Sequence, residues 1–330
     1  MPQPVAPRIG KTQNWLMLSL IPLLLSVIIA ISLTSGVYDF SLAQALSILV
    51  HADTSKASLV LWELRLPRTL VALTGGAALA ISGWLMQAVV RNPLASPNLT
   101  GVMSGAALAV MISELMAWPA PTLVLGILGG ILGGFTTISI SWKQGVTPAR
   151  LALAGIAVSA FCQACVTLVL LTDRVDSESL FFWLTGSIAG ANWEVFTPLF
   201  SATVLIVILL ALTNKQRLYL QLDDQVARGI GVNLNQYRLV FGVLAVVLTA
   251  ACVGAFGPVG FIGLVAPHLA RLTRTGLLGA AIIGAALLTL ADLLARTLLM
   301  PLEIPIGVLT ALMGAPWFLY LIIQRARVSG

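Results

Sequence analysis

Residues 68–90 read RTLVALTGGAALAISGWLMQAVV, and this stretch decides the fold of the chain. It is almost wholly apolar and, at about 1.5 Å per residue, a helix of this length crosses the roughly 30 Å hydrocarbon layer of a membrane. Lipid offers no hydrogen-bond partners, so a spanning segment must satisfy its own backbone as a helix or close into a barrel. The stretch lacks the alternating pattern of a barrel strand and therefore predicts a transmembrane helix.

Similar segments recur in both directions along the chain. Of the 330 residues, 58% are hydrophobic and 9% are charged, whereas a soluble domain averages about 45–50% and about 25%. This composition excludes an ordinary soluble fold. We expect an all-α polytopic membrane protein forming one domain over residues 1–330, with ten segments at 16–35, 68–90, 99–117, 122–142, 150–171, 194–213, 237–256, 259–272, 277–299 and 305–324. The eighth segment is too short to span ideally.

The basic residues predict the orientation of these segments. With the N-terminus in the cytoplasm, thirteen of the 18 Lys and Arg residues fall on the cytoplasmic side, including Arg91, Lys143 and Arg271, as the positive-inside rule requires. Both termini then face the cytoplasm. The first segment is followed by Gly36 and Asp39 rather than by a cleavage site of small residues, so we interpret it as a retained helix. The net charge of +6 is spread singly between segments and does not indicate a nucleic-acid-binding face.

Small residues and prolines mark special positions. Glycines recur at helical spacing, as in Gly75, Gly76, Gly83 and the run from Gly126 to Gly134, and predict close helix packing without chemistry. Two interruptions, residues 91–97 and 257–260, contain prolines that remove backbone donors. Broken helices of this kind line transport pathways in some membrane proteins. A simple tight turn fits either interruption nearly as well.

Residue types that perform catalysis are present but poorly arranged. Cys162 and Cys165 match a redox C-x-x-C pattern inside an apolar helix, where two small buried residues are the better interpretation. Gly10-Lys11-Thr12 lacks the first glycine of a phosphate-binding loop and no strand precedes it. His268 and the other histidine have no partner at metal-ligand spacing, and we expect His268 to hydrogen-bond in a packed helix end. The sequence predicts no catalytic residues, no metal site and no cofactor in this chain.

Ion-coupled transport is a second hypothesis. Such transporters place ionisable residues near the middle of the membrane, and this chain places almost none there. Asp292 and Arg296 are the nearest exception, but their i, i+4 spacing lets them pair with each other. An ion-coupled transporter or channel is therefore disfavoured.

The longest predicted cytoplasmic connection covers residues 214–236. Within it, LDDQVARGIGV at 222–232 reads as a short capped helix, with Asp223 as N-cap and Gly229 or Gly231 as terminator. A short helix at this position is either a solvated loop or a knob for a partner protein. The loop alone does not decide between them.

Several motifs along nearly the whole chain resemble those of one protein family. They are RLPRT at 65–69, GAALAISG at 76–83, RNPLASP at 91–97, GFIGLVAPH at 260–268, ADLLAR at 291–296, PIGV at 305–308 and GAP at 314–316. With the 222–232 segment, they resemble the FecCD family of ABC importer permeases, whose members serve ferric siderophores, haem and cobalamin. The resemblance implies a type II ABC importer permease fold of about ten helices in the bacterial inner membrane. It also implies import of an iron(III)-siderophore, with cobalamin or haem as same-family alternatives.

The resemblance further implies the partners and the residues that meet them. Expected partners are a second permease, homologous or identical, two cytoplasmic ATPases that bind ATP and Mg, and a periplasmic substrate-binding protein. The 214–236 loop would insert into the ATPase through Asp223, Asp224, Val226, Arg228 and Gly231. The fifth segment and a short helix after Asp176 would line the pathway.

Two further sets of residues follow from the resemblance. The cytoplasmic gate would consist of Asn92, Leu94, Thr147 and Pro148, where Pro148 replaces a hydroxyl residue common in the family. Arg65, Arg68 and Arg296 fall outside by the orientation rule. From position alone they could equally be membrane anchors, and the resemblance favours docking of the binding protein.

Overall fold

The structure is a computed structural model that describes residues 11–36, 38, 40–51, 53–142, 147–172, 177–222 and 224–329. In these ranges every regular element is a helix, which confirms the all-α prediction. The ten predicted segments correspond to α1 (Lys11–Thr34), α4 (Leu66–Val90), α5 (Val102–Leu115), α6 (Thr122–Ser141), α7 (Pro148–Leu170), α9 (Trp193–Leu212), α12 (Leu234–Phe256), α13 (Ile262–Leu272), α14 (Gly276–Thr297) and α15 (Ile306–Ser329).

The helices differ in their ability to cross a membrane. In the described part of the chain, six helical stretches are long and apolar enough to span, and they contain α4, α6, α7, α9, α12 and α14. Shorter apolar stretches lie in α1, α5, α13 and α15. The expected multi-pass architecture is therefore present, with six of the ten predicted segments long enough to span and the other four forming shorter apolar stretches.

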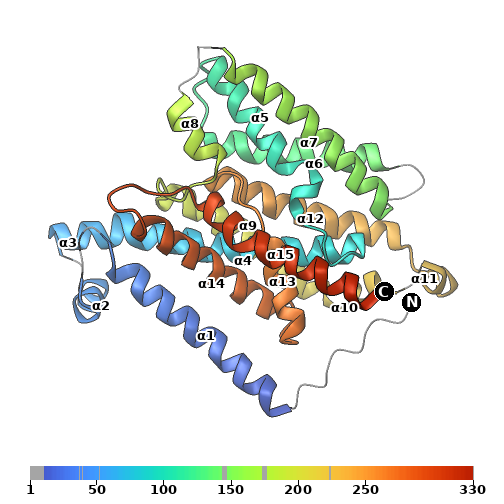
Figure 1. Cartoon of the computed structure of the whole chain (residues 1–330), viewed down its shortest axis with the longest axis horizontal. Helices are drawn as coiled ribbons and strands as arrows, with labels where there is room; N and C mark the ends of the chain where they lie inside the picture. The colour runs from blue at the N-terminus through green and yellow to red at the C-terminus, as the bar shows by residue number, and fades with distance from the viewer. Residues whose placement is uncertain are drawn as a thin grey trace.

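Short helices connect the long ones. They are α2 (Leu42–Val50), α3 (Lys56–Leu59), a π-helical turn η1 (Val60–Arg65), a 3-10 turn η2 (Pro97–Thr100), α8 (Ser177–Leu184), α10 (Asn214–Arg217), a second 3-10 turn η3 (Leu218–Gln221) and α11 (Asp224–Gly229). A capping box starts α2, because the Ser41 hydroxyl accepts from the Gln44 N–H and the Gln44 side chain accepts from the Ser41 N–H. Figure 1 shows α2 and α3 at one end of the molecule and α11 at the other.

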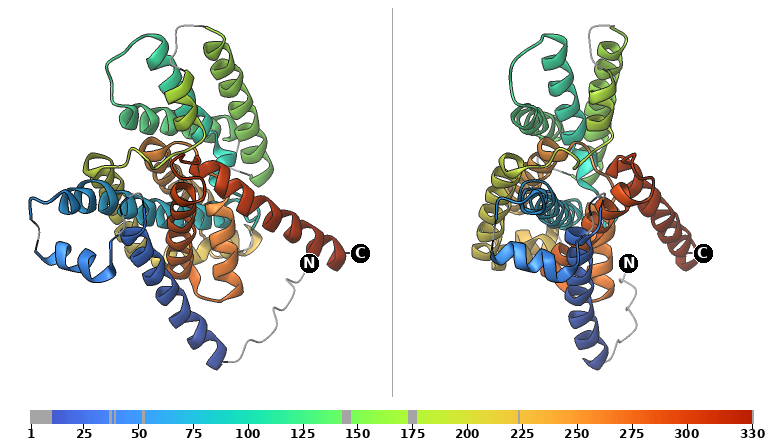
Figure 2. Two further views of the ribbon diagram at one scale, coloured as in Figure 1. Left: turned by 60° about the vertical axis from the view of Figure 1, so that its left-hand side comes forward. Right: turned by 90° about the vertical axis from the view of Figure 1, so that its left-hand side faces the viewer.

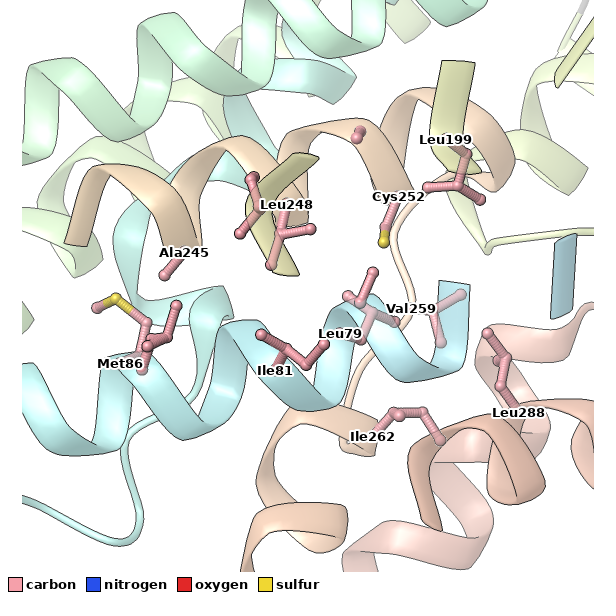
Figure 3. Packing of buried hydrophobic residues seen from close by; sticks show 14 of the residues in the cluster. Leu79, Ile81, Met86, Leu199, Ala245, Leu248, Cys252, Val259, Ile262 and Leu288 are labelled. Carbon is pink, nitrogen blue, oxygen red and sulfur yellow. The ribbon is translucent and has the colours of Figure 1, made fainter. Parts of the chain in front are cut away.

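The helix α4 passes through the middle of the molecule (Figure 1). It runs antiparallel to α12, where the Ser82 hydroxyl donates to the Ala245 carbonyl at 2.8 Å and the Cys252 thiol donates to the Gly75 carbonyl at 3.7 Å. It also packs closely against α14 and α13, at Gly76 and Gly83 respectively. Leu79 of α4 faces α12 in the buried core (Figure 3).

Glycine lets these helices approach to backbone contact, as the sequence predicts. A Cβ added at Gly83 would lie 1.8 Å from the Gly263 carbonyl of α13, and one at Gly76 would lie 2.2 Å from the Gly284 carbonyl of α14. Any side chain at these positions would separate the helices. The close-packing interpretation of these glycines is confirmed.

A second group of helices stands to one side. Figure 2 shows α5, α6, α7 and α8 together in both views. Their own small core joins Val110 and Met111 of α5 to Val166 of α7 and Leu180 of α8. The helix α6 connects this group to α12, because Gly126 packs against the backbone of Gly254.

The interruption before α13 is a reversal of the chain inside the helical bundle. The helix α12 ends at Phe256, beside Gly75, and α13 begins only at Ile262 rather than at residue 259. The Ser187 N–H donates to the Phe256 carbonyl at 2.9 Å, and a Cβ at Gly257 would lie 2.1 Å from the Trp183 carbonyl. This interruption is packed in protein, and α13 runs beside only the second half of α4.

Candidate functional site

The predicted functional residues gather at the two ends of α4. This helix has 25 residues and is about 37 Å long at 1.5 Å per residue. Arg68 lies in its first turn and contacts the last turns of α14. Arg91 ends it and contacts the segment before α11. The predicted docking residues and the predicted ATPase loop are therefore on opposite sides of the molecule, as the orientation requires.

At the first end, an ion network joins α4 to α14. The Arg68 Nε lies 2.9 Å from the Asp292 carboxylate, and its two terminal nitrogens donate to Glu303 at 2.9 and 3.1 Å. The Arg296 Nε lies 3.7 Å from the other Asp292 oxygen, which confirms the predicted i, i+4 pair. Asp292 is only 1% exposed, so its charge is compensated entirely inside the protein.

The other two arginines at this end hold α1. The Arg296 guanidinium donates to the carbonyl and the hydroxyl of Ser32 at 2.6 and 2.7 Å. Arg65 is 6% exposed and donates to the Leu33 and Thr34 carbonyls at 2.9 and 2.8 Å, and to the Tyr38 carbonyl. The last carbonyls of a helix lack partners within the helix, and Arg65 supplies partners for those that end α1.

The structure thus brings Arg65, Arg68 and Arg296 to one end and gives each of them partners within the chain. Among the contacts described, the exposed one is that of Arg68 with Glu303, whose side chain is 39% exposed. Between α2 and α3, the hydroxyl and N–H of Ser55 donate to Asp53 at 2.6 and 3.1 Å and lower the pKa of that carboxyl. Docking through these arginines stays a prediction, and Arg68 is its most accessible member.

At the opposite end, the predicted ATPase loop is anchored before its helix begins. Leu220 of η3 is buried in the main core, and Tyr219 packs on Tyr237 of α12 with ring centroids 5.1 Å apart. The helix α11 follows. Asp223, the predicted N-cap, lies outside the described residues, as do the side chains of Asp224 and Arg228.

The end of α11 matches the predicted terminator. Gly231 has φ 74°, and the Val232 N–H donates to the Ala227 carbonyl at 2.8 Å. Both features define a Schellman motif with Gly231 in the left-handed position. Val226 and Ile230, four residues apart, are 54% and 61% exposed, whereas Ala227 is fully buried. The loop therefore presents an apolar ridge, defined here as Val226 and Ile230, away from the protein.

One predicted gate loop is a compact turn after α4. The Asn92 side chain accepts from the Leu94 N–H and the Asn92 carbonyl accepts from the Ala95 N–H, both at 2.9 Å. Gly101, at φ 69°, lies against Thr137 of α6 and Val158 of α7. The loop and the turn that follows it therefore tie α4 to the second group of helices.

The other predicted gate loop is described only at its end. Residues 143–146 and the Pro148 side chain lie outside the description. Thr147 is exposed and its carbonyl accepts the first bond of α7, from the Leu151 N–H at 3.0 Å. Pro148 is the first residue of α7, a position that needs no backbone donor. Figure 1 shows α7 beginning on the side where α11 lies.

The predicted pathway helix α7 presents a large apolar face. Leu153, Phe161 and Leu168 are exposed, whereas Cys162 and Val166 pack inward. The neighbouring α8 exposes Phe181 and Phe182. Cys162 and Cys165 are free thiols, and within the described ranges no three His, Cys, Asp or Glu side chains form a metal-binding group.

The sequence did not predict three residues that make side-chain contacts at the two ends of α4. Glu303 is the exposed partner of Arg68, Gln87 accepts a hydrogen bond from Arg271 of α13, and Arg91 donates to Leu220 and Leu222. The signal for Gln87 was a single amide in an otherwise apolar stretch. His268 packs edge-on against Trp317, with ring centroids 6.1 Å apart, and its expected hydrogen bond stays a prediction.

Comparison with known proteins agrees with this geometry. The model of the FecCD transport family matches residues 24–324. The Fe(3+)-citrate import system permease YfmD of Bacillus subtilis is 36% identical, over 94% of this chain and 96% of its own. The hemin transport system permease HmuU of Yersinia pestis is 40% identical, over 97% and 99%. A metal-chelate type ABC transporter in an inward-facing conformation superposes with a TM-score of 0.78 at 32% identity, over 94% of this chain and 99% of that one.

Proposed function

The chain belongs to the FecCD transport family, and we propose that it is the membrane permease subunit of an ATP-driven importer of iron(III) chelates, with ferric siderophores as the primary substrates. The relatives act on ferric citrate and hemin by name, which supports this substrate class. Haem and cobalamin are the same-family alternatives. The proposed site of action is the bacterial inner membrane, with both termini in the cytoplasm.

The apolar ridge on α11 is the observation that carries the proposal. Two large apolar side chains, Val226 in α11 and Ile230 in the turn that follows it, project from a segment that is held by Leu220 on one side and ended by Gly231 on the other. Apolar anchors at helical spacing are the usual way in which a helix fills a groove on a partner. We infer that the groove belongs to a cytoplasmic ATPase, which would bind ATP and Mg and supply the energy.

The remaining partners follow from the other surfaces. A second permease, identical or homologous, would complete the pathway beside the open face of α7. A periplasmic binding protein would dock near Arg68. The apolar face of α7 suits a large, already complexed substrate, because conduction requires binding weak enough for release.

Replacing Gly231 with Val tests the role of the ridge. A β-branched residue at φ 74° is strained by about 1–2 kcal/mol, which would reorient the end of α11. We expect uptake by the reconstituted transporter to fall about tenfold while ATP hydrolysis continues. Gly229→Val is the matched control, because an added Cβ there meets no atom within 4 Å. Normal uptake by Gly231→Val would remove the coupling role.

The docking role of Arg68 is tested by replacing Arg68 and Glu303 one at a time. A charge reversal at Arg65 would place a carboxylate among three carbonyl groups, so it would not test docking alone. We expect Arg68→Gln to weaken salt-sensitive binding of the loaded binding protein, and Glu303→Gln to strengthen it by removing a competitor. Unchanged binding in both variants would leave these residues with a purely structural role.

The substrate class and energy source are tested together. Proteoliposomes containing the complete transporter should accumulate labelled ferric siderophore when ATP is enclosed with the ATPase. A protonophore should not stop this uptake. Loss of uptake with the protonophore would favour the ion-coupled alternative, and preferential uptake of haem or cobalamin would reassign the substrate.

A further inference from the structure

Arg91 connects the end of α4 to the segment that leads into α11. It is the C-cap of α4, with φ 51°, and its Nε donates to the Leu220 carbonyl at 3.4 Å. Its Nη2 donates to the Leu222 carbonyl. Leu222 is separated from the first residue of α11 by one residue. The Arg91 guanidinium therefore holds the backbone of residues 220–222, which lead directly into α11.

The residue after Arg91 begins the predicted gate loop. The Asn92 N–H donates to the Gln87 carbonyl at 3.2 Å, and the Asn92 side chain fixes the Leu94 N–H at 2.9 Å. A displacement of Arg91 must therefore move the turn that contains Leu94. The contact crosses more than a hundred residues of sequence and joins the two predicted cytoplasmic elements directly.

The same turn of α4 is held firmly on its other side. The Gln87 amide donates to the Gly263 carbonyl at 3.4 Å, and its oxygen accepts from Arg271 of α13. The Arg271 guanidinium also lies over Trp84, 5.5 Å from the ring centroid. Gln87 thus fixes α4 to α13, and the side chain of Arg91, one turn later, contacts the segment before α11.

Arg91 has a left-handed backbone conformation, in which an arginine is unusual. A left-handed φ disfavours residues with a Cβ, and glycine is the residue that adopts it without strain. Compared with glycine, an arginine at this position is strained but forms two hydrogen bonds, to the Leu220 and Leu222 carbonyls. The planar fork of arginine can reach two carbonyls at once, whereas the compact ammonium of lysine is a point donor.

We propose that Arg91 is a positioning residue that transmits the movement of α11 to the gate loop at Asn92 and Leu94. The inference rests on the proposed coupling role of α11 and adds to it a physical route. Movement of α11 pulls the Leu222 carbonyl, the guanidinium carries the displacement to the end of α4, and the Asn92 turn moves with it.

Two substitutions separate the side chain from the backbone. Arg91→Gly removes the bonds and relieves the left-handed strain, so any defect arises from the lost side chain. Arg91→Lys keeps a positive charge without the fork. In the complete transporter with its ATPase, we expect both variants to hydrolyse ATP while uptake of ferric siderophore falls about tenfold or more, as for the loss of a charge-assisted hydrogen bond.

Arg274→Gly is the matched control. Arg274 also has a left-handed backbone, with φ 55°, and follows the end of α13, the helix held to α4 by Gln87. The control therefore removes a similar residue in a similar conformation. We expect it to keep both uptake and ATP hydrolysis. Equal losses in Arg274→Gly and Arg91→Gly would overturn the proposal, because the effect would then be one of charge alone.

A pair of reporters tests transmission directly. In a background with the three native cysteines replaced, an environment-sensitive fluorophore is attached either at residue 94 or at residue 225, which is exposed on α11 and is not part of the apolar ridge. With Arg91 present, ATP should change the signal at both positions. With Arg91→Gly, the signal at 225 should still change and the signal at 94 should not. A normal ATP response at 94 in this variant would overturn the proposal.

Failure of this inference is distinguishable from failure of the proposed function. If Gly231→Val uncouples the transporter but Arg91→Gly imports normally, α11 couples to the ATPase and transmits through another contact. If the unmodified transporter imports no iron(III) chelate, the proposed function fails. A reporter response at 94 that depends on Arg91 would support the mechanical link for whichever substrate the transporter carries.

Discussion

The helices α4 and α7 are both long, apolar and expected to span the membrane, yet they occupy opposite environments. In the stretch that contains α4, an 18-residue apolar segment is 72% buried in the protein, whereas the corresponding segment of α7 is 33% buried. The more buried helix is the less hydropathic of the two. Eight of the 17 buried residues of α4 are Gly, Ala, Ser or Thr, whereas α7 exposes Leu153, Phe161 and Leu168.

This difference shows what drives helix packing in a membrane. Lipid tails are as apolar as leucine, so large apolar side chains gain little by facing another helix. Small residues allow backbone contact, and polar side chains find partners there. The helix α4 therefore becomes the axis of the fold through Gly76, Gly83 and Ser82, and α7 keeps its large side chains for lipid or for a second subunit.

Removing the buried carboxylate beside α4 should give the largest loss of stability. Asp292→Ala leaves Arg296 without its carboxylate partner and Arg68 with Glu303 alone, and breaking a buried ion pair in this way costs about 3–5 kcal/mol. Unfolding of the purified chain in detergent measures the change. Glu303→Ala is the control, because its exposed pair should contribute no more than about 1 kcal/mol. Equal costs would show that the network is solvated.

A methyl group between helices should have the next largest effect. Gly83→Ala places a Cβ 1.8 Å from the Gly263 carbonyl, and such overpacking costs about 1–3 kcal/mol. Gly242→Ala in α12 is matched, since its Cβ would meet nothing within 4 Å, and should stabilise its helix by up to about 1 kcal/mol. Thermal unfolding of the two variants should therefore shift in opposite directions. A stable Gly83→Ala would contradict backbone contact as the basis of the α4 core.

Truncating the exposed face of α7 should have the smallest effect. Phe161→Ala changes a side chain that faces away from the protein, and such changes usually stay within about 0.5 kcal/mol. The free energy of unfolding of the isolated chain should be unchanged. A loss as large as that of Gly83→Ala would show that α7 is packed like α4 and remove the contrast between them.

Much of this structure could be predicted from local patterns in the sequence. The apolar segments predicted the helices, the glycine spacing predicted close packing, and Asp292 with Arg296 predicted an ion pair one turn apart. The capped pattern also predicted a terminator at Gly229 or Gly231, and the structure places it at Gly231. Each of these features depends on residues within a few positions of one another, where the helical period determines which side chains meet.

Features that depend on distant residues were not predictable in this way. The Arg68 contact with Glu303 and the Arg91 contact with Leu222 join residues far apart in the chain. The helix α13 begins only at Ile262 and lies beside only part of α4, because the chain between α12 and α13 packs at Gly257 against Trp183. No local pattern states which carbonyl or carboxylate an arginine will reach, because that is decided when the helices are assembled.

The sequence by itself therefore determined that this chain forms apolar helices in a membrane, since lipid leaves the backbone no alternative. It also determined where these helices can touch, because only glycine and other small residues permit backbone contact. The tertiary structure alone decided that α4 lies at the centre and α7 at the side. It also decided that Arg65 supports α1 and that Arg91 holds the segment before α11, because the partner of a long polar side chain is set by the packing of distant helices.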